Sequence, residues 1–262
     1  MLPATWKPIE VGGLIRLGSP RDGGYVVPKR AVLASKSLIS MGLNDDWQFE
    51  KSFRRLADAE VVCFDHSVTW KFWLRYYVEQ VLRLRWRRLG RYLDYRLFFS
   101  RPGVEHRQIR IGYDQPGEVN VPSLLKEFSG SNIFLKIDIE GSEYRILDDI
   151  AMNSSRFTCV VIEFHDVDLH RDRILRFVEG MTNFSIVFLH PNNFAGTDDQ
   201  GDPLVLEMCL VRDDLLDPAV PGEPRPELPA NTSRRADIEL RFAPADTSQP
   251  PEFRRDRAVG AE

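Results

Sequence analysis

The chain of 262 residues lacks several features that would fix its class at once. It has only three cysteines, Cys63, Cys159 and Cys209, and their spacing matches no metal-binding motif. Each lies in an apolar, strand-like run, so we interpret them as buried thiols. No apolar stretch approaches the roughly 18 residues that a membrane-spanning helix needs. The N-terminus shows no basic region followed by an apolar run, so we predict no secretory signal and a cytoplasmic location.

A strong net charge and a nicotinamide-binding motif are also missing. The net charge is −4, which argues against a general nucleic-acid binder, and we predict no nucleic-acid partner. No Gly-x-Gly-x-x-Gly motif is present, which disfavours an enzyme that uses a nicotinamide cofactor. What remains is an ordinary globular composition, 43% hydrophobic and 28% charged, long enough for a sizeable core.

Strand-like and helix-like segments alternate along the first 212 residues. This order is typical of an α/β protein with a Rossmann-like, doubly wound and mainly parallel sheet. The link after Leu189 is too short for a crossover helix, so the last two strands are expected to be antiparallel. Strands are expected at 25–28 (after a tight turn at Asp22-Gly-Gly), 37–42, 61–65, around Ile109 and Ile111, at 133–139, 157–164, 184–189 and 204–211; helices are expected at 47–59 (inner face Trp47, Phe49, Phe53 and Leu56), 122–128, 143–151 and 171–181.

The composition changes near residue 213. Residues 213–262 are rich in Pro, Asp, Glu and Arg, which indicates a loosely packed or disordered tail, pinned by the strand-like segment 238–242. We therefore expect one domain over 1–212 and a tail over 213–262.

The segment 133–143 carries charge where a central strand should be apolar. Lys136, Asp138 and Glu140 share one face of the expected strand, and only the other face is apolar. Gly141 then breaks the strand, and Ser142 is placed to cap the next helix. Such charges are costly unless a ligand, ion or partner compensates them, and open α/β sheets bind ligands at this end. The segment indicates either a site or a buried structural ion network.

The segment Leu135-Lys-Ile-Asp-Ile-Glu-Gly-Ser-Glu143 resembles the fourth-strand signature of the FkbM family of S-adenosylmethionine-dependent methyltransferases. Val160-Val-Ile-Glu-Phe-His165 resembles that family's fifth strand, Val119-Asn-Val-Pro-Ser-Leu-Leu125 its preceding short helix, and Asp22-Gly-Gly-Tyr25 a segment of some branches. The resemblance implies a class I methyltransferase fold of seven strands with a terminal antiparallel hairpin. It also implies S-adenosylmethionine as cofactor and O-methylation of a small-molecule or glycan substrate: a sugar, a polysaccharide precursor or a natural product.

One motif departs from the family pattern. Where the family has Asp-x-Gly-x-x-x-Gly, this chain has Ser40-Met-Gly-Leu-Asn-Asp-Asp46, with a single glycine. The alternative is therefore a catalytically degenerate protein that keeps the fold as a binding or scaffold module.

The resemblance assigns cofactor contacts to four residues. Gly42 would let the backbone approach the methionine part of the cofactor, and Asn44 follows in the same turn. Asp65, about 20 residues past that turn, would accept hydrogen bonds from the ribose hydroxyls. Asp138 would lie near the sulfonium. The alternative for Asp65 is a simple turn former.

Four ionisable side chains are expected to meet at one sheet edge and form the catalytic set: Asp138, Glu140, Glu163 and His165. In one scheme His165 is the general base, held by Glu163 or Asp166. In the other, Asp138 with Glu163 or His165 holds a divalent cation such as Mg²⁺. His165 could also belong to an ordinary polar loop.

Residues 71–101, which we call the basic insertion, carry nine Lys and Arg against two acids, with aromatic residues throughout. Three interpretations stay open. The insertion covers the site as a lid, it contacts a membrane or a lipid-linked substrate, or it is a helix with aromatic residues inside and arginines in solvent.

Overall fold

The chain folds around a seven-stranded sheet with the strand order β5-β4-β3-β8-β9-β11-β10. We describe a computed structural model over all residues except 20–22, 114, 223–225, 227–236 and 245–262. Strand pairs from β5 to β9 are parallel, and β11 is antiparallel to both β9 and β10, which confirms the doubly wound sheet and its terminal antiparallel pair. The strands are β3 (Ser37–Met41), β4 (Glu60–Phe64), β5 (Val104–Arg107), β8 (Ile133–Ile137), β9 (Phe157–Phe164), β10 (Phe184–Pro191) and β11 (Leu206–Arg212).

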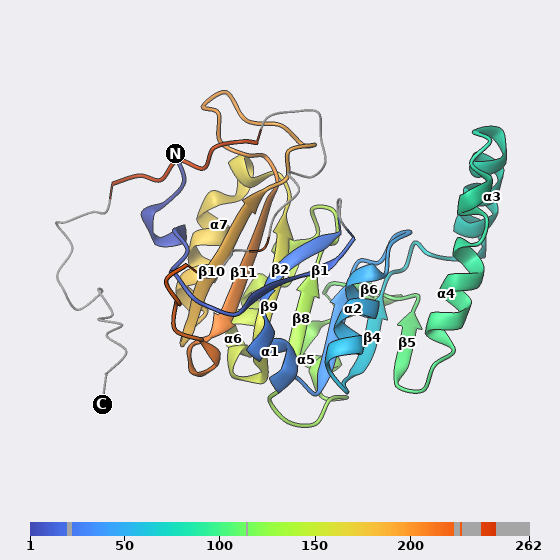
Figure 1. Cartoon of the computed structure of the whole chain (residues 1–262), viewed down its shortest axis with the longest axis horizontal. Helices are drawn as coiled ribbons and strands as arrows, with labels where there is room; N and C mark the ends of the chain where they lie inside the picture. Colours follow the sequence, from blue (N-terminus) through green and yellow to red (C-terminus); the bar gives the residue numbers. More distant parts are fainter. Residues whose placement is uncertain (20–22, 114, 223–225, 227–236, 245–262) are drawn as a thin grey trace.

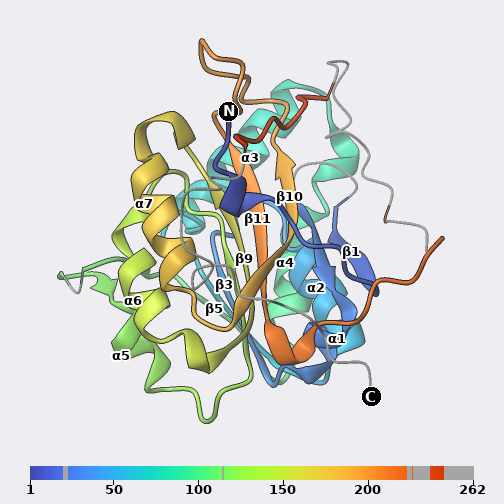
Figure 2. The same cartoon turned by 90° about the vertical axis from the view of Figure 1, so that its left-hand side faces the viewer.

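Helices cover both faces of this sheet, as Figure 2 shows edge-on. On one face lie α1 (Lys29–Ala34) and α2 (Gln48–Leu56); on the other lie α5 (Val121–Leu125), α6 (Leu147–Met152) and α7 (Val167–Gly180). Successive residues of a strand point to opposite faces, so Leu38 packs into one core cluster and Ile39 into the other. Short 3₁₀ turns complete the helical set at Ala4–Trp6, Ser154–Arg156 and Asp213–Leu215.

An N-terminal hairpin packs beside the sheet. Strands β1 (Leu14–Gly18) and β2 (Gly24–Pro28) pair antiparallel, and β2 contacts both β10 and β11. The β2 strand confirms the expectation for 25–28, while the turn at Asp22 lies outside the described residues. The side chain of Tyr25, in β2, is buried.

Two sequence-based expectations, about the third parallel strand and about Leu56, were wrong in detail. The third parallel strand is Val104–Arg107; Arg110–Ile111 (β6) instead pairs with Glu118–Val119 (β7) in a separate two-stranded sheet. The edge strand escaped notice because Val104 is its only buried side chain. In α2, Leu56 does not belong to the inner face and is 40% exposed.

The expected helix 143–151 is broken. A 3₁₀ turn at Glu143–Arg145 precedes α6, and Ser142 makes no capping hydrogen bond through its side chain. Glu143 satisfies the backbone here instead, because its carboxylate accepts hydrogen bonds from the N–H groups of Ile139 (3.1 Å) and Gly141 (3.2 Å). Ile146, with φ −121° and ψ −2°, leaves the helical conformation between the turn and α6, so the segment does not continue as one helix.

The basic insertion forms two helices beside the edge strand β5, and they stand away from the sheet (Figure 1). These are α3 (Trp70–Leu82) and α4 (Arg91–Phe99), joined by a 3₁₀ turn at Trp86–Arg88. Trp73 packs edge-on or tilted against Trp47 and Tyr95, with ring centroids 6.2 and 5.2 Å apart. No helix in the described part of the chain is both long and apolar enough to cross a membrane.

Part of the expected tail is bound to the N-terminal segment. Phe242 forms a bridge with Leu2, and the backbone of Leu2 bonds to Arg241 and Ala243. This contact agrees with the pinning role predicted for 238–242. Most of the rest of the tail lies outside the described residues.

Candidate functional site

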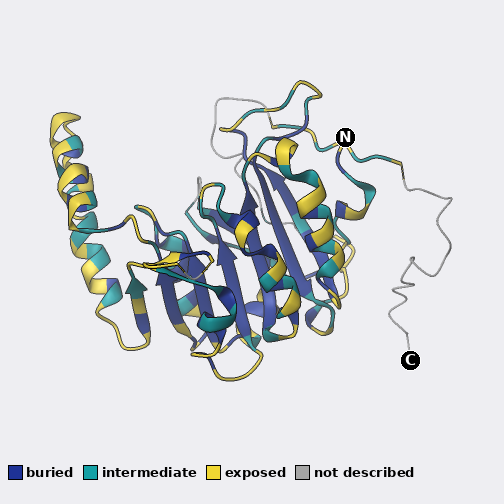
Figure 3. Ribbon diagram, turned by 180° about the vertical axis from the view of Figure 1, so that it is seen from behind, coloured by how far each residue is buried: buried dark blue, intermediate teal, exposed yellow. Residues whose placement is uncertain are grey.

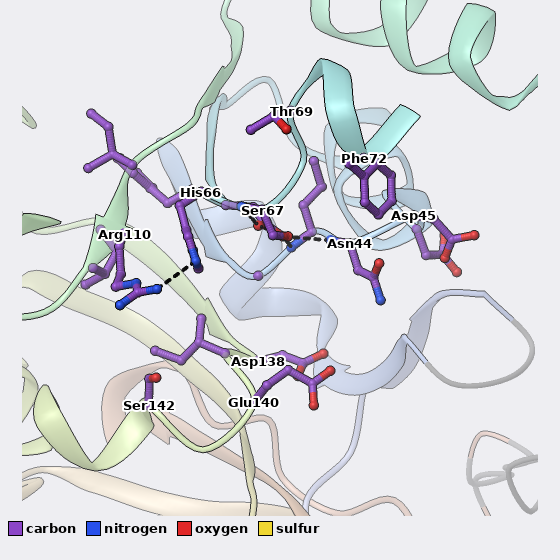
Figure 4. Close-up of a pocket in the computed structure, with 18 of the residues that line it drawn as sticks. Asn44, Asp45, His66, Ser67, Thr69, Phe72, Arg110, Asp138, Glu140 and Ser142 are labelled. Carbon is purple, nitrogen blue, oxygen red and sulfur yellow. Dashed lines mark hydrogen bonds between the residues drawn. The ribbon is translucent and has the colours of Figure 1, made fainter. Parts of the chain in front are cut away.

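A pocket of about 830 Å³ opens at the carboxyl ends of β3, β4 and β8. The chain leaves β3 toward β4 on one side and returns at β8 on the other, so β3 lies at the switch point where such sheets bind ligands. The volume is within the usual range for small-molecule sites. Figure 4 shows Asp138 and Glu140 side by side on one wall, with Asn44, His66 and Ser67 opposite.

Gly42 lies where two strand ends approach each other most closely. Its φ is +87°, and a Cβ built there would lie 1.6 Å from the carbonyl oxygen of Asp138. Its N–H donates to the carbonyl of Phe64 (2.9 Å), and its carbonyl accepts from the Lys136 ammonium (2.8 Å). Only glycine fits this conformation and this space. The single glycine kept in the segment 40–46, which otherwise differs from the family pattern, is therefore the one that the geometry requires.

Asp65 organises the loop that follows Gly42. One carboxylate oxygen accepts from the backbone N–H groups of Leu43 (2.9 Å) and Asn44 (2.8 Å). The other accepts from the N–H (2.8 Å) and hydroxyl (2.6 Å) of Ser67. Burial opposes ionisation, but these four hydrogen bonds outweigh it and lower the pKa of Asp65. The carboxylate lines the pocket, yet its acceptor sites already serve the loop. Its contact with a ribose stays a prediction.

Lys136 lies beneath the pocket. Its side chain is 5% exposed, and its ammonium lies 4.0 Å from a carboxylate oxygen of Asp138. Burial alone would lower the pKa of Lys136, but the negative charges of Glu50 and Asp138 raise it, so the ammonium stays charged. Lys136 therefore supports the strand ends and neutralises acids there.

Tyr25 joins the two acidic strands of the site. Its hydroxyl lies 3.0 Å from Asp138 and 3.2 Å from Glu163. Burial, together with those two negative charges, raises the pKa of Tyr25 well above its usual value, so the hydroxyl keeps its proton and donates. Glu163 also accepts from the amide of Asn192 (2.7 Å). Glu163 is thus buried behind Asp138 and does not line the pocket.

His165 has a different partner from the two that we expected. Its Nδ1 lies 3.1 Å from the buried carboxylate of Glu143, and neither Glu163 nor Asp166 holds it. Its Nε2 lies 3.5 Å from Glu140 at the pocket wall. Burial disfavours the charged ring, but the bond to Glu143 and the nearby charges outweigh it and raise the pKa of His165 to about 9.

A metal could be held only where Asp138, Glu140 and His165 converge among the described residues. One potential ligand atom from each lies within 4.8 Å of the others. A ligating imidazole must be neutral, whereas the pKa of His165 is raised to about 9. A metal ion bound there would therefore have to displace the His165 proton, which this raised pKa opposes at neutral pH.

The cofactor implied by the resemblance fits the character of this pocket. Gly42 and Asn44 lie at one end, Asp138 adds a carboxylate, which suits a cationic ligand, and Phe64, Ile109 and Ile111 add apolar wall. Of the predicted site residues, the structure brings Asp138, Glu140 and His165 together, places Gly42, Asn44 and Asp65 across the pocket, and sets Glu163 behind Tyr25.

Two residues of the site were missed from the sequence. Tyr25 ends the Asp22-Gly-Gly-Tyr25 segment, and Glu143 ends the fourth-strand signature, so both lay in motifs already noted. Their roles depend on contacts across 113 and 22 residues, which no local pattern reveals.

Cationic side chains surround the mouth of the pocket. Lys71 and Arg75 come from the first turns of α3, and Arg110 lies beside His66, with 2.9 Å between their nitrogens. Among the described residues, no acid forms an ion pair with Lys71 or Arg75. The site thus combines an acidic wall with a basic mouth.

A family model, the methyltransferase FkbM domain, matches residues 27–188. Among curated proteins no relative matches the sequence. Similar solved structures include an rRNA methylase from Streptococcus thermophilus, with 12% identity, coverage of 70% of this chain and 91% of that chain, and a TM-score of 0.39. A second is the 23S rRNA methyltransferase ErmE, with 11% identity, coverage of 74% of this chain and 69% of that chain, and a TM-score of 0.40. A third is a precorrin-6y C5,15-methyltransferase from Geobacter metallireducens, with 10% identity, coverage of 70% of this chain and 84% of that chain, and a TM-score of 0.38.

Proposed function

The chain belongs to the FkbM methyltransferase family, and from that premise we propose that it methylates a hydroxyl group, with His165 as the base that removes the hydroxyl proton. As a member it is an S-adenosylmethionine-dependent methyltransferase. The observation that carries the proposal is the Glu143–His165 pair, because His165 Nε2 lies 3.5 Å from the carboxylate of Glu140, which lines the pocket.

S-adenosylmethionine supplies a methyl group on a positively charged sulfur, which leaves with the electrons of the broken C–S bond. The contribution of this chain is alignment and charge. The loop of Gly42 and Asn44, which Asp65 keeps in place, would lie close along the methionine part. Asp138, held by Tyr25, gives the cation a fixed negative neighbour.

Proton removal falls to the Nε2 atom of His165. A proton on Nδ1 shared with Glu143 leaves Nε2 as the free base of the neutral ring. As the hydroxyl oxygen attacks the methyl carbon, its proton passes to Nε2, and Glu143 stabilises the resulting imidazolium. A cationic cofactor bound in the pocket would lower the pKa of His165 and so would favour its neutral ring.

The substrate class follows from the family resemblance and from the basic mouth. We infer an acceptor with both a hydroxyl and an anionic group: a sugar, a polysaccharide precursor or a natural product with a phosphate or carboxylate. Lys71, Arg75 and Arg110 would hold the anion by charge-assisted hydrogen bonds.

The test is methyl transfer from labelled S-adenosylmethionine to a panel of sugar phosphates and hydroxy acids, read by mass spectrometry. We expect O-methylated product with the unmodified enzyme, and roughly hundredfold slower turnover or worse with His165→Gln, in the range typical of a lost general base. Methylation exclusively at nitrogen or carbon, or full activity of His165→Gln, would refute the proposal.

A further inference from the structure

The exposed apolar side chains of this protein are concentrated on the basic insertion and on Trp70, which starts its first helix. Nine of the eighteen large hydrophobic side chains that are exposed among the described residues lie between 70 and 97. On α3 they recur at the helical spacing as Trp70, Leu74, Val78 and Leu82, with 69%, 58%, 53% and 78% of each exposed. A helix in water normally turns such a stripe inward.

The stripe is not the packing face of the insertion. The opposite side of α3 is already buried through Trp73, Tyr76 and Gln80. The two helices contact each other through Trp73 and Tyr92, whose ring centroids are 5.1 Å apart. α3 is therefore apolar on two sides, and only one of them has a partner within the described chain.

The tip between the two helices alternates apolar and basic residues. Leu82, Leu84 and Trp86 are largely exposed, and Arg83, Arg85 and Arg88 lie between or beside them, also exposed. Figure 3 shows this end of the insertion as its most exposed part. Leucine and tryptophan interleaved with arginine suit the interface of a bilayer, where apolar side chains enter the acyl boundary and guanidinium groups meet phosphates.

The insertion is anchored to the domain at its base. Asp94 accepts from the indole of Trp47 (3.0 Å) and pairs with Lys51 (2.5 Å). Arg91 pairs with Asp46 at 3.4 Å. These contacts join the base of the insertion to the start of α2.

Charge favours one occupant for this surface. The nine basic and two acidic residues give the insertion a charge of +7, while the whole chain has −4, which leaves −11 for the rest. An anionic surface would attract the insertion and repel the body of the protein. A second copy would have to bring two insertions of equal charge together. RNA would leave the exposed leucines and valines in water.

We propose that the basic insertion docks this protein onto an anionic lipid bilayer, with Leu82, Leu84 and Trp86 inserted and the neighbouring arginines on lipid phosphates. α3 has 13 residues, about 20 Å of helix, too short to span a bilayer, so it lies in the interface. Its first turns line the pocket through Lys71, Phe72 and Arg75. If methyl transfer occurs in that pocket as proposed, docking brings the pocket mouth to the lipid surface.

The test is flotation of the full chain with phosphatidylcholine vesicles, with and without phosphatidylglycerol. We expect flotation only with the anionic vesicles, and its loss at high salt. The variant Leu82→Ser/Leu84→Ser/Trp86→Ser and the variant Arg83→Gln/Arg85→Gln/Arg88→Gln should each bind at least about tenfold more weakly. The matched control, Leu33→Ser/Met152→Ser/Leu169→Ser, changes equally exposed side chains elsewhere and should float normally.

Circular dichroism and S-adenosylmethionine binding establish that each variant is folded. Neither readout nor flotation requires methyl transfer, so failure of the docking proposal is separate from failure of the proposed reaction. No flotation of the wild-type chain, or equal loss in the control variant, would overturn it. Two other results without flotation would also overturn it. One is binding of the wild-type chain to an RNA oligonucleotide. The other is a dimer, seen by sedimentation, that the Leu82→Ser/Leu84→Ser/Trp86→Ser variant no longer forms.

Discussion

The hydroxyl of Tyr25 lies 3.0 Å from the carboxylate of Asp138, although 113 residues separate them in the sequence. The same hydroxyl lies 3.2 Å from Glu163, so one buried donor serves the acidic ends of two neighbouring strands. Because the N-terminal hairpin supplies it, the site is complete only when that hairpin is packed on the sheet.

Removing this hydroxyl should affect both stability and turnover. In Tyr25→Phe, two carboxylates lose their shared donor, and a hydrogen bond to a charged group is worth about 1.5–3 kcal/mol. We expect the free energy of unfolding, measured in urea, to fall by an amount within that range and kcat to fall with it. Tyr77→Phe is the matched control, because the Tyr77 hydroxyl donates to the carbonyl of Leu89 in the insertion (3.0 Å), away from the site. Equal kcat for both variants would show that Tyr25 acts only in folding.

The pH dependence of the reaction should report His165. Its pKa is raised to about 9, above the ordinary value of about 6.5, so the neutral base becomes more abundant as pH rises toward 9. Since kcat/KM reports groups of the free enzyme, kcat/KM should rise about tenfold per pH unit below that value.

Glu143→Gln tests the cause of that profile. Glutamine keeps a carbonyl acceptor for the Ile139 and Gly141 N–H groups but removes the charge beside His165. We expect the rising limb of kcat/KM to move to lower pH, and an NMR titration of the His165 ring to move with it. An unchanged midpoint would contradict the assignment of His165 as the base.

The bonds of Asp65 predict its effect on cofactor affinity. Asp65→Asn replaces one acceptor oxygen by a donor, so either the Leu43 and Asn44 amides or Ser67 lose a partner. We expect the dissociation constant for S-adenosylmethionine, measured by equilibrium dialysis, to rise at least about tenfold. Asp58→Asn, which removes a fully exposed carboxylate paired with Arg54, should leave it unchanged.

The space at Gly42 predicts a severe effect of adding one methyl group. In Gly42→Ala the new Cβ would clash with the Asp138 carbonyl at 1.6 Å, in a backbone conformation that alanine avoids. We expect a loss of more than about 2 kcal/mol in unfolding free energy, measured by thermal and urea denaturation. Gly90→Ala is the control, because no atom lies within 4 Å of its Cβ position. A stable Gly42→Ala protein would contradict the described strand contact.

Sequence patterns predicted the parts of the fold that rest on local periodicity. The fully buried strand Phe157–Phe164 and the antiparallel final pair are examples, because their apolar runs and short connection leave few alternatives. The edge strand Val104–Arg107 was missed because one buried residue gives no periodic signal. The buried thiols were also predicted correctly, since Cys63, Cys159 and Cys209 are all free and buried.

The site was predicted as a location better than as a set of contacts. Charges at the end of a buried strand indicated Asp138 and Glu140, and both line the pocket. The sequence does not show which acid contacts His165, because Glu143, Glu163 and Asp166 are all near it along the chain or on the next strand. Glu143 is the partner because its side chain turns into the core beside the His165 ring.

The most direct test is calorimetric titration of the folded chain with S-adenosylmethionine. The account predicts saturable binding of one cofactor per chain in the pocket at the ends of β3, β4 and β8, weakened by Asp138→Asn and unaffected by Asp58→Asn. A folded chain that gives no saturable heat, or an Asp138→Asn variant that binds as well as the wild type, would contradict it.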